Sequence, residues 1–415
     1  MSVGIVGLGY VGLPLAVAFA RAGHDVVGVE VDARRANAIN EGRSYIEDVP
    51  DEQLADLGGR ISASTRFDAL RPVDAILICV PTPLSANREP ELGPLLEAAN
   101  QLARVLRPGQ LVVLESTTYP GTTRERLAPL LEESGLAAGR DFALAFSPER
   151  VDPGQVNFTI RNTPKVVGGL TEDCTDRAAE LYAAVCEEIV RVSTPEVAEL
   201  SKLLENIFRS VNIALVNELA ILTDRMDIDI WEVVDAAATK PFGFMRFEPG
   251  PGMGGHCLPV DPFYLSWRAR EFDFATEFIE LAGKINQRMP YHCVERIERA
   301  LNDVGKPVRG SRVTLLGVAY KPGVGDTRES PALKIAALLD ARGAEVVYHD
   351  PHVTELPGSG LRSQPLDEAL QGSEVAVIVT AHAEVDLGVV ARDAPLVVDL
   401  RGVTRHERLA NVERL

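Results

Sequence analysis

The sequence predicts an α/β fold, with two Rossmann-like doubly wound domains joined by a long helix and a central all-helical region. Short apolar runs alternate with amphipathic stretches at both ends of the chain, which is typical of parallel strands linked by helical crossovers. Over residues 195–302 the apolar period is helical instead. The chain has 415 residues, too many for one ordinary core, so more than one domain is expected.

The first domain is expected over residues 1–194. Its helical patterns cover 13–22, 94–106 and 172–186. The strand candidates are short aliphatic runs, namely Val3–Val6, Val26–Val29, Ala75–Val80, Leu111–Glu115, Phe142–Phe146, Val166–Gly168 and Ile189–Val192. Because helices separate most of these runs, a parallel, doubly wound sheet is predicted.

The central region is expected over residues 195–305. Its long helix begins with Thr194 as N-cap, Pro195 at the first helical position and Glu196 in the first turn, and should end near Arg225. The apolar faces of these helices need a covering surface. We therefore expect a homodimer through this region, or a higher oligomer.

The third domain is expected over residues 306–415. A helical pattern covers residues 331–342. The strand candidates are Val313–Leu316, Glu345–Tyr348, Val375–Val379 and Leu396–Asp399. These elements predict a second, smaller α/β unit.

The charge balance narrows the expected partners. The chain carries 42 basic and 60 acidic side chains, a net charge of −18, so neither nucleic acid nor anionic lipid is expected as a partner. No segment approaches the roughly 20 apolar residues that span a bilayer, so no membrane association is expected. Glycines and Pro14 interrupt residues 1–20, which argues against a signal peptide.

The cysteines and histidines predict no metal centre. The five cysteines form neither a CxxC pair nor a short-spaced framework, which fits a reducing, cytoplasmic location. His349 and His352 share an HxxH spacing, but on a strand-end turn this spacing is more typical of a structural role than of metal binding.

A dinucleotide-binding loop is predicted after the first strand. The GxGxxG pattern reads Gly7-Leu8-Gly9-Tyr10-Val11-Gly12 and opens a helix. Glycines there let the backbone approach a pyrophosphate, and the helix N-terminus stabilises its charge. Glu30 ends the next strand and suits the ribose hydroxyls, which favours NAD, with Arg35 as a further contact. Arg34 and Arg35 leave NADP open on these residues alone, and a turn without a ligand is the alternative.

Two more loops follow strands at the same sheet edge, where doubly wound sheets bind ligands. Pro81 and Thr82 lie in "VPTP", and Thr117 lies in "ESTT". Either loop alone is ordinary turn chemistry. Their position after successive parallel strands makes these residues candidate cofactor contacts.

Cys257 is the candidate nucleophile. It lies in "EPGPGMGGHCLPVDPFYL", residues 248–265, where glycine and proline leave little side-chain bulk around the thiol. A helix that starts just after the cysteine would favour the thiolate, and Asp261 lies within reach. The alternative is a buried structural thiol.

Three polar residues accompany this thiol as candidates. Lys202 and Asn206 are four residues apart on one face of the long helix and can donate to an oxyanion at a thiol-bound carbon. Glu149 follows a strand in "SPER" and offers a general base. Read alone, they are equally well a solvated surface pair and a turn acid.

Together these motifs resemble the UDP-glucose/GDP-mannose dehydrogenase family over nearly the whole chain. They are "GLGYVGLPLA", "VPTP", "ESTTYPGTT", "SPER", "AELSKLLENIFRSVNIALVNELA", "GPGMGGHCLPVDP" and "GVAYKPGVGDTRESPAL". The resemblance implies an NAD domain, a central dimerising helical region and a C-terminal domain that binds the nucleotide of a UDP-sugar. It implies an NAD-dependent UDP-sugar 6-dehydrogenase, which converts the C6 alcohol to a carboxylate through an aldehyde, a thiohemiacetal and a thioester on Cys257.

The resemblance also implies roles for the matching residues. Lys202 and Asn206 would stabilise the oxyanion, Asp261 would assist proton transfer through water, Thr117 would position the water, and Glu149 would act as base in the final hydrolysis. The implied cofactor contacts are Gly7, Gly9, Tyr10, Val11, Gly12, Glu30, Arg35, Pro81, Thr82, Thr117 and Arg328. The implied substrate contacts are Glu149, Arg150, Lys202, Asn206, Arg246, Gly254, His256, Lys321 and Arg401, with Arg246 resembling an arginine that reaches the partner subunit's substrate.

The substrate loop indicates a branch of the family. Many UDP-glucose enzymes carry Gly-Gly-Ser-Cys at this place, whereas this chain has Gly254-Gly255-His256-Cys257. The loop resembles the branch that acts on UDP-N-acetylglucosamine or UDP-N-acetylmannosamine and that supplies polysaccharide biosynthesis. UDP-glucose is the alternative substrate.

Two other classes of protein compete with this prediction. A two-electron hydroxyacid dehydrogenase needs neither a nucleophilic thiol nor a second α/β domain. A non-catalytic nucleotide-sugar binder would be indicated by the loss of Cys257, Lys202 or Glu149, and all three are present.

Overall fold

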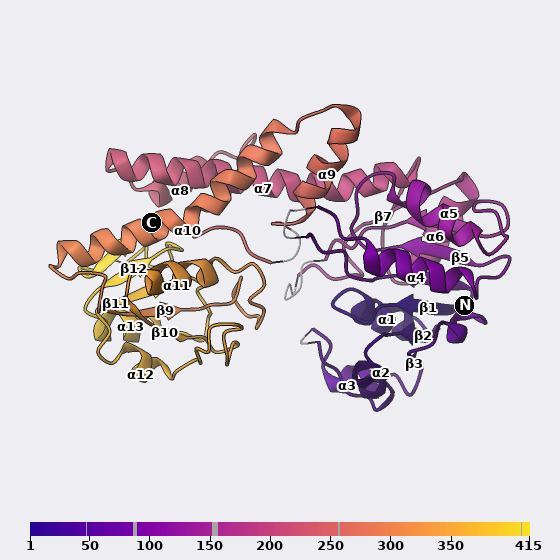
Figure 1. Cartoon of the computed structure of the whole chain (residues 1–415), viewed down its shortest axis with the longest axis horizontal. Coiled ribbons are helices and arrows are strands. Elements are labelled where there is room, and N and C mark those ends of the chain that lie inside the picture. The colour runs from indigo at the N-terminus through magenta and orange to yellow at the C-terminus, as the bar shows by residue number, and fades with distance from the viewer. Residues whose placement is uncertain (47, 86–88, 152–156, 256–257, 408) are drawn as a thin grey trace. The chain divides into compact units, whose positions relative to one another are not determined.

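The computed structural model describes residues 1–415 except 47, 86–88, 152–156, 256–257 and 408. The chain forms two compact units, which are described separately (Figure 1). The first comprises Met1–Glu205 with Phe263–Phe274, and the second comprises Asn206–Pro262 with Ala275–Leu415. Each unit contains a sheet of mainly parallel strands joined by helices, which confirms the predicted fold class.

The first unit is built on an eight-stranded sheet in the order β3-β2-β1-β4-β5-β6-β7-β8. The strands are β1 (Ser2–Val6), β2 (Asp25–Val29), β3 (Ile61–Ser64), β4 (Ala75–Ile78), β5 (Leu111–Leu114), β6 (Ala143–Phe146), β7 (Lys165–Gly169) and β8 (Ile189–Val192). The main helices are α1 (Gly12–Arg21), α2 (Ala33–Asn40), α3 (Asp51–Ala55), α4 (Gly93–Ala103), α5 (Ala128–Glu132) and α6 (Glu172–Tyr182). Strands β4, β5 and β6 are buried along their whole length, as expected of a sheet covered on both faces.

The strand order reverses at β1 and so creates a site for a ligand. Val6 at the end of β1 pairs with Val29 of β2 on one side and with Ile78 of β4 on the other. The loops that follow these three strands therefore meet at one edge. Ligands bind at such a switch point in doubly wound sheets.

Two details of this sheet differ from the prediction. Strand β7 runs antiparallel to β6, whereas a parallel neighbour was predicted. A parallel pair needs a long crossover, usually a helix, and the described residues between 147 and 164 contain no helix. Strand β3 was not predicted, because its sequence "ISAS" is short and half polar.

The central helices follow the prediction closely. Helix α7 (Pro195–Met226) is the predicted long helix and continues from the first unit into the second. Helices α8 (Ile230–Ala238), α9 (Asp261–Ala269) and α10 (Glu277–Asp303) follow it. The described residues of 240–260 form a loop that leads to α9. Among the described residues, no helix is long and apolar enough to cross a membrane.

The second unit has a five-stranded parallel sheet in the order β10-β9-β11-β12-β13. The strands are β9 (Arg312–Leu316), β10 (Glu345–His349), β11 (Val375–Ile378), β12 (Val397–Asp399) and β13 (Val412–Arg414), and the helices are α11 (Pro331–Ala341), α12 (Leu366–Leu370) and α13 (Leu387–Asp393). Met289 and Ile297 of α10 share a buried cluster with Val313 and Leu315 of β9. The sheet order again reverses beside the first strand, so a second switch point lies at the ends of β9 and β11.

Candidate active site

The glycine loop after β1 has the geometry of a dinucleotide site. A Cβ at Gly12 would lie 1.9 Å from the carbonyl oxygen of Gly7, whereas a Cβ at Gly9 would meet no described atom within 4 Å. Gly12 therefore closes the turn, and Gly9 leaves an open approach. Helix α1 begins at Gly12 after Val11, without a side-chain cap and without an acid in its first turn. The Leu13 amide donates to the Gly9 carbonyl at 3.0 Å and Pro14 has no N–H, so the Gly12 amide at the start of the helix is left to face an anion.

Glu30 ties this loop to the end of β2. The carboxylate is buried and accepts hydrogen bonds from the amides of Leu8 and Asp32, each at 3.1 Å. The Tyr45 hydroxyl donates to the Leu8 carbonyl at 2.8 Å, and the Arg35 guanidinium lies 5.1 Å from the centre of the Tyr45 ring. Glu30 and Arg35 thus flank the loop as predicted, while Tyr10 is exposed beside it.

Arg34 is paired with its own neighbour. Its guanidinium Nη2 lies 2.8 Å from the carboxylate of Asp32, and the hydrogen bond from Arg34 lowers the pKa of Asp32 to about 2. Asp32 also caps α2. One of the two cations that left NADP open is therefore engaged with an acid, whereas Arg35 lies over the Tyr45 ring.

The loops after β4 and β5 are linked to each other. The Thr82 hydroxyl donates to the Thr117 carbonyl at 2.7 Å, and the Ser116 hydroxyl donates to the Val80 carbonyl at 2.6 Å. The Tyr264 hydroxyl donates to the Thr82 carbonyl at 2.5 Å. The structure therefore brings two sequence-predicted residues, Thr82 and Thr117, together at the switch-point edge.

Thr118 is a residue that the sequence analysis missed. Its side chain is buried, and its hydroxyl finds no hydrogen-bond partner among the residues that the structure describes. A buried hydroxyl usually has a partner, so this group is suited to a ligand or a water. Its position one residue after Thr117 was the only available signal.

A buried carboxylate holds the same segment to α7. Glu199 accepts hydrogen bonds from the amides of Gly121 at 2.6 Å and Thr123 at 2.9 Å, and from the Thr123 hydroxyl at 2.7 Å. Burial raises the pKa of Glu199 to about 7. Because Lys202 follows Glu199 by three residues on α7, this contact ties the start of α7 to the segment that follows Thr117 and Thr118.

Glu149 lies after β6 beside a buried ammonium. Its Oε1 accepts hydrogen bonds from the amides of Arg150 at 2.8 Å and Val151 at 2.7 Å, and its Oε2 lies 3.6 Å from Nζ of Lys165. The neighbouring Arg150 pairs with Glu205 at 2.7 Å and donates to the Pro164 carbonyl at 2.6 Å. The Glu149 carboxylate is thereby held in a fixed orientation.

Asn206 and Asp261 form a buried pair in the second unit. Nδ2 of Asn206 donates to Oδ2 of Asp261 at 2.5 Å, and each residue is less than a tenth exposed. Asp261 is the first residue of α9. Lys202 and Asn206 lie four residues apart on α7, as predicted. His256 and Cys257 lie outside the described residues.

The segment before the cysteine packs against the loop after β9. The Gly255 amide donates to the Arg328 carbonyl at 3.0 Å, and a Cβ at Gly254 would lie 2.7 Å from Cβ of Tyr320. Within the second unit, the structure thus brings predicted residues Gly254 and Arg328 together, beside Lys321.

The predicted arginines of the second unit have local partners. The Arg328 guanidinium contacts the Asp326 carboxylate at 2.5 Å. Arg401 donates to the Val379 carbonyl at 2.7 Å, and burial lowers its pKa. Arg246 pairs with Asp235 at 2.6 Å and with Glu248 at 2.9 Å.

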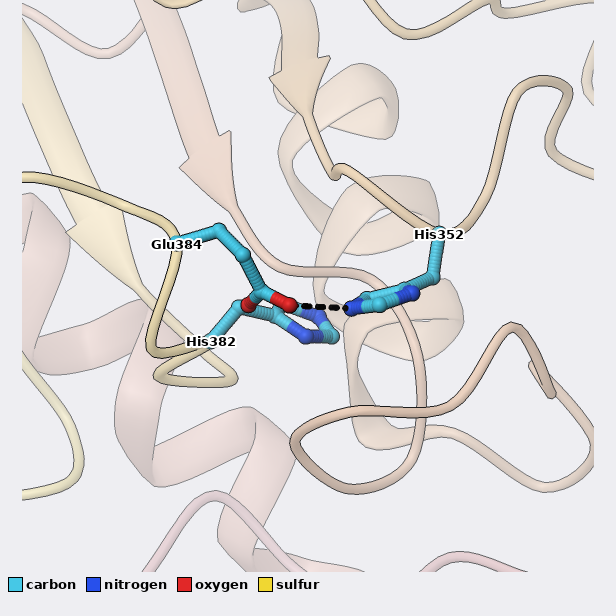
Figure 2. Close-up of side chains that lie close together, drawn as sticks. All are labelled: His352, His382 and Glu384. Atoms are coloured by element: carbon cyan, nitrogen blue, oxygen red, sulfur yellow. Dashed lines mark hydrogen bonds and ion pairs between the residues drawn. The ribbon is translucent and has the colours of Figure 1, made fainter. Parts of the chain in front are cut away.

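Two histidines of the second unit, His352 and His382, lie close to Glu384 (Figure 2). Nε2 of His352 lies 3.1 Å from Oε1 of Glu384, and the His352 and His382 rings are 4.9 Å apart. Nδ1 of His382 accepts from the Gly323 amide at 3.2 Å, and Nε2 of His382 lies 3.1 Å from Asp350. The side chains of His352, His382 and Glu384 lie close enough together to hold a metal ion. Ligation through His382 would, however, break one of the two hydrogen bonds of its ring. His382 thus serves as a link between the loops after β9, β10 and β11.

Comparison with known proteins agrees with this geometry along the whole chain. Residues 1–186, 196–288 and 314–406 match the NAD binding, central and UDP binding domains of the UDP-glucose/GDP-mannose dehydrogenase family. The chain is 37% identical over 388 residues to a UDP-N-acetyl-D-mannosamine dehydrogenase of Pyrococcus horikoshii, covering 92% of this chain and 90% of the relative. It is 35% identical over 429 residues to one of Escherichia coli strain K12, covering 97% and 99%.

Solved structures are also similar. A UDP-D-ManNAc dehydrogenase from Pyrococcus horikoshii superposes with a TM-score of 0.91 at 34% identity, covering 100% of this chain and 98% of that one. A UDP-glucose dehydrogenase from Pyrobaculum islandicum gives 0.88 at 30% identity, covering 99% and 96%. These similarities confirm the prediction of an NAD-dependent nucleotide-sugar dehydrogenase. The chain belongs to the UDP-glucose/GDP-mannose dehydrogenase family.

Proposed function

We propose that this enzyme oxidises C6 of a UDP-N-acetylhexosamine, either UDP-N-acetylmannosamine or UDP-N-acetylglucosamine, from alcohol to carboxylate. The observation that supports this substrate best is the similarity, over nearly the whole chain, to relatives named for UDP-N-acetyl-D-mannosamine. UDP-glucose is the alternative, because a UDP-glucose dehydrogenase has a nearly equal structural similarity.

The chemistry proceeds through the thiol of Cys257. NAD, when bound, would supply the hydride acceptor of the first oxidation, and a second NAD molecule would supply that of the second. After the first oxidation the thiolate adds to the C6 aldehyde and gives a thiohemiacetal, which becomes a thioester on the second. Water then attacks the thioester carbonyl, the carbon–sulfur bond breaks, and the thiolate leaves as the carboxylate forms. An aldehyde has no hydride to give readily until a nucleophile adds, which is why one reactive thiol is needed.

Asn206 and Lys202 stabilise the negative charge that forms on the oxygen bonded to C6, and Asp261 orients Asn206. The Asp261 carboxylate occupies one N–H of the Asn206 amide, so the second N–H can donate to the oxyanion in a fixed direction. The Lys202 ammonium, one turn earlier on α7, is a second donor. Asp261 also assists proton transfer through water.

Glu149 takes a proton from the attacking water. Its Oε1 is occupied by two backbone amides, which leaves Oε2 to act as the general base. Thr117 would position this water, and we add the buried hydroxyl of Thr118, which has no hydrogen-bond partner in the described part of the chain, as a second group that can orient it.

The remaining contacts follow the two switch points. The residues that would hold NAD are Gly7, Gly9, Tyr10, Val11, Gly12, Glu30, Arg35, Pro81, Thr82, Thr117 and Arg328. The UDP-sugar is held by Arg150, Arg246, Gly254, His256, Lys321 and Arg401, with Arg246 reaching the partner subunit's substrate.

The domains and the assembly are part of the same proposal. We divide the chain into an NAD-binding domain at 1–194, a helical dimerisation region at 195–305 and a UDP-sugar domain at 306–415. Large apolar side chains recur at helical spacing on α7 and are exposed, namely Leu200, Leu204, Phe208, Leu215, Leu219 and Leu222. Such a stripe needs a cover, and a second copy of the same helix supplies it. We place the enzyme in the cytoplasm, where NAD and UDP-sugars occur.

The ratio of NADH formed to UDP-sugar consumed tests the function. A ratio near two supports the four-electron oxidation, a ratio near one indicates a two-electron dehydrogenase, and zero indicates a binding protein. Running the assay on the two N-acetylhexosamine substrates and on UDP-glucose identifies the sugar. Cys257→Ala should abolish uronate formation, and a variant that keeps full production would contradict the mechanism.

A further inference from the structure

A buried charge network in the first unit includes groups to which no role has been assigned. Lys165 begins β7, and its ammonium donates to Oε2 of Glu115 at 2.8 Å and to the Pro148 carbonyl at 3.0 Å. The same ammonium lies 3.6 Å from Oε2 of Glu149. The exposed fractions of the Lys165, Glu115 and Glu149 side chains are 6%, 0% and 17%.

The hydrogen bonds show which of these groups are charged. Burial raises the pKa of Glu115, but the Lys165 charge and the hydrogen bonds from Lys165 and the Tyr182 hydroxyl act against this, which favours the carboxylate form beside the ammonium. Burial alone would lower the pKa of Lys165, but the charges of Glu115 and Glu149 raise it above its usual range. The single ammonium of Lys165 therefore interacts with two carboxylates, those of Glu115 and Glu149.

The other titratable groups around the network stay neutral. Burial raises the pKa of the Cys79 thiol and of the Tyr182 hydroxyl well above their usual ranges, and raises the pKa of Cys186 to about 11. The remaining charged neighbours, Arg150 and Glu205, pair with each other at 2.7 Å. Among the residues that the structure describes, the charge that Glu149 meets at close range is thus set by Lys165 and Glu115.

A buried group of charges like this one contributes little to the stability of the fold, which suggests a functional role. A buried ion pair seldom stabilises a fold more than apolar side chains of similar size would. Here the ammonium contacts the proposed base and also the carbonyl of Pro148, the residue before that base. Perturbed, buried charges next to a reacting group are typical of functional sites.

We propose that Lys165 is a positioning residue for Glu149. Its ammonium is shared between Glu149 and Glu115, and this sharing determines how readily Glu149 takes a proton from the hydrolytic water. This inference rests on the proposed function, in which Glu149 is the base. An ammonium alone would hold Glu149 as a weak base. The second carboxylate offsets that charge, so Glu149 is fixed in place and still able to accept the proton.

Two substitutions should shift the pH dependence in opposite directions. The measured quantity is the slow NADH phase that follows the first turnover, when thioester hydrolysis is rate-limiting. Glu115→Gln leaves the ammonium to Glu149 alone, so the acid limb of this rate should move about one pH unit lower. Lys165→Met leaves Glu149 beside another carboxylate, so the acid limb should move about one pH unit higher. The initial NADH burst should stay within about twofold, because these groups do not act in the oxidation steps.

A double variant guards against misfolding. Lys165→Met strands a buried carboxylate and can unfold the protein, whereas Lys165→Met with Glu115→Gln removes both charges. The acid limb of the double variant should lie above that of Glu115→Gln alone. Arg191→Met is the matched control. Arg191 lies on β8, the strand next to β7, and the substitution removes its exposed ion pair with Asp176 of α6. The acid limb of this variant should coincide with that of the unmodified enzyme.

The outcomes separate this inference from the proposed function. If Glu115→Gln and the double variant share the acid limb of the unmodified enzyme, or if burst and slow phase fall together, Lys165 only supports the fold. If the unmodified enzyme itself does not form two NADH per UDP-sugar, the proposed function fails instead.

Discussion

The loop between the first strand and the first helix is held in a similar way in the two sheets, but it begins its helix differently. In both, the glycine after the first strand donates to the end of the next strand, Gly7 to Val29 at 2.8 Å and Gly317 to His349 at 2.9 Å. In both, an acid after that next strand accepts amides of the loop, Glu30 from Leu8 and Asp350 from Val318 and Ala319. The frame around the two switch points is therefore the same.

The loops themselves differ in length and in how the helix that follows begins. Helix α1 starts at Gly12 without a side-chain cap, whereas α11 starts only at Pro331 and is capped by the Ser330 hydroxyl. The first loop can offer the Gly12 amide at the start of its helix to a pyrophosphate. The second cannot offer its helix amides as readily and instead carries a side-chain cation, Lys321, whereas Arg328 is paired with Asp326. One sheet is thus suited to bind phosphate through backbone amides, and the other through side chains.

The two acids differ as well. Glu30 accepts two amides and can also accept ribose hydroxyls. Asp350 accepts four backbone amides and the His382 ring. Burial by itself would raise the pKa of Asp350, but the hydrogen bonds from His382 and the amides hold it down to about 2. Asp350 therefore shapes its loop and is not available to a ligand.

The largest expected effect comes from filling the first glycine turn. Gly12→Ala places a Cβ 1.9 Å from the Gly7 carbonyl, so the loop must open. We expect NAD affinity to fall at least about a hundredfold, or ~2.7 kcal/mol, while UDP affinity is kept. Calorimetric titration with NAD and UDP separately measures this. Gly9→Ala is the control, which should keep the melting temperature and lose only NAD affinity. Unchanged NAD binding by Gly12→Ala would show that this turn is not the cofactor site.

The next effect concerns the stability of the second unit in acid. The pKa of Asp350 is depressed to about 2 from a usual 3.8, so its ionised form stabilises the fold above pH ~4, and that stability is lost as the pH falls toward 2. The contribution is about 2 kcal/mol. Asp350→Asn should lower the free energy of unfolding near neutral pH by that order and flatten its dependence on acid pH, as denaturant titrations at several pH values would reveal. The same acid slope in both proteins would contradict this assignment.

A smaller effect is expected from the side-chain cation of the second loop. Lys321→Met should weaken UDP binding about tenfold, or ~1.4 kcal/mol, and leave NAD binding unchanged. Lys334→Met, an exposed lysine on α11, is the matched control. If UDP affinity stays constant, or if NAD affinity falls in its place, the contrast between the two loops is wrong.

The smallest effect is expected at Glu30. Glu30→Gln keeps a hydrogen-bond acceptor but removes the charge that repels a 2′-phosphate, so NAD affinity should fall about fivefold and the preference for NAD over NADP should narrow. The kcat/KM values for the two cofactors measure this. An unchanged preference would mean that Glu30 does not face the ribose.

Local patterns in the sequence were enough to predict the parts of the site that follow a strand directly. The GxGxxG loop, Glu30 and the Thr82 and Thr117 loops depend on strand ends and helix starts, which short windows reveal. The contact of Lys165 with Glu115 spans fifty residues, and no local period marks it. The antiparallel direction of β7 relative to β6 was missed for a similar reason. The direction of a strand depends on the segment that connects it to its neighbour and not on the sequence of the strand itself.

The chemistry at Cys257 is decided most directly by trapping the thioester. Glu149→Gln should be incubated with UDP-N-acetyl-D-mannosamine and NAD, quenched and analysed by peptide mass spectrometry. The account predicts a burst of two NADH per site and a peptide in which Cys257 carries the uronyl group. Continued turnover with an unmodified Cys257 would contradict it.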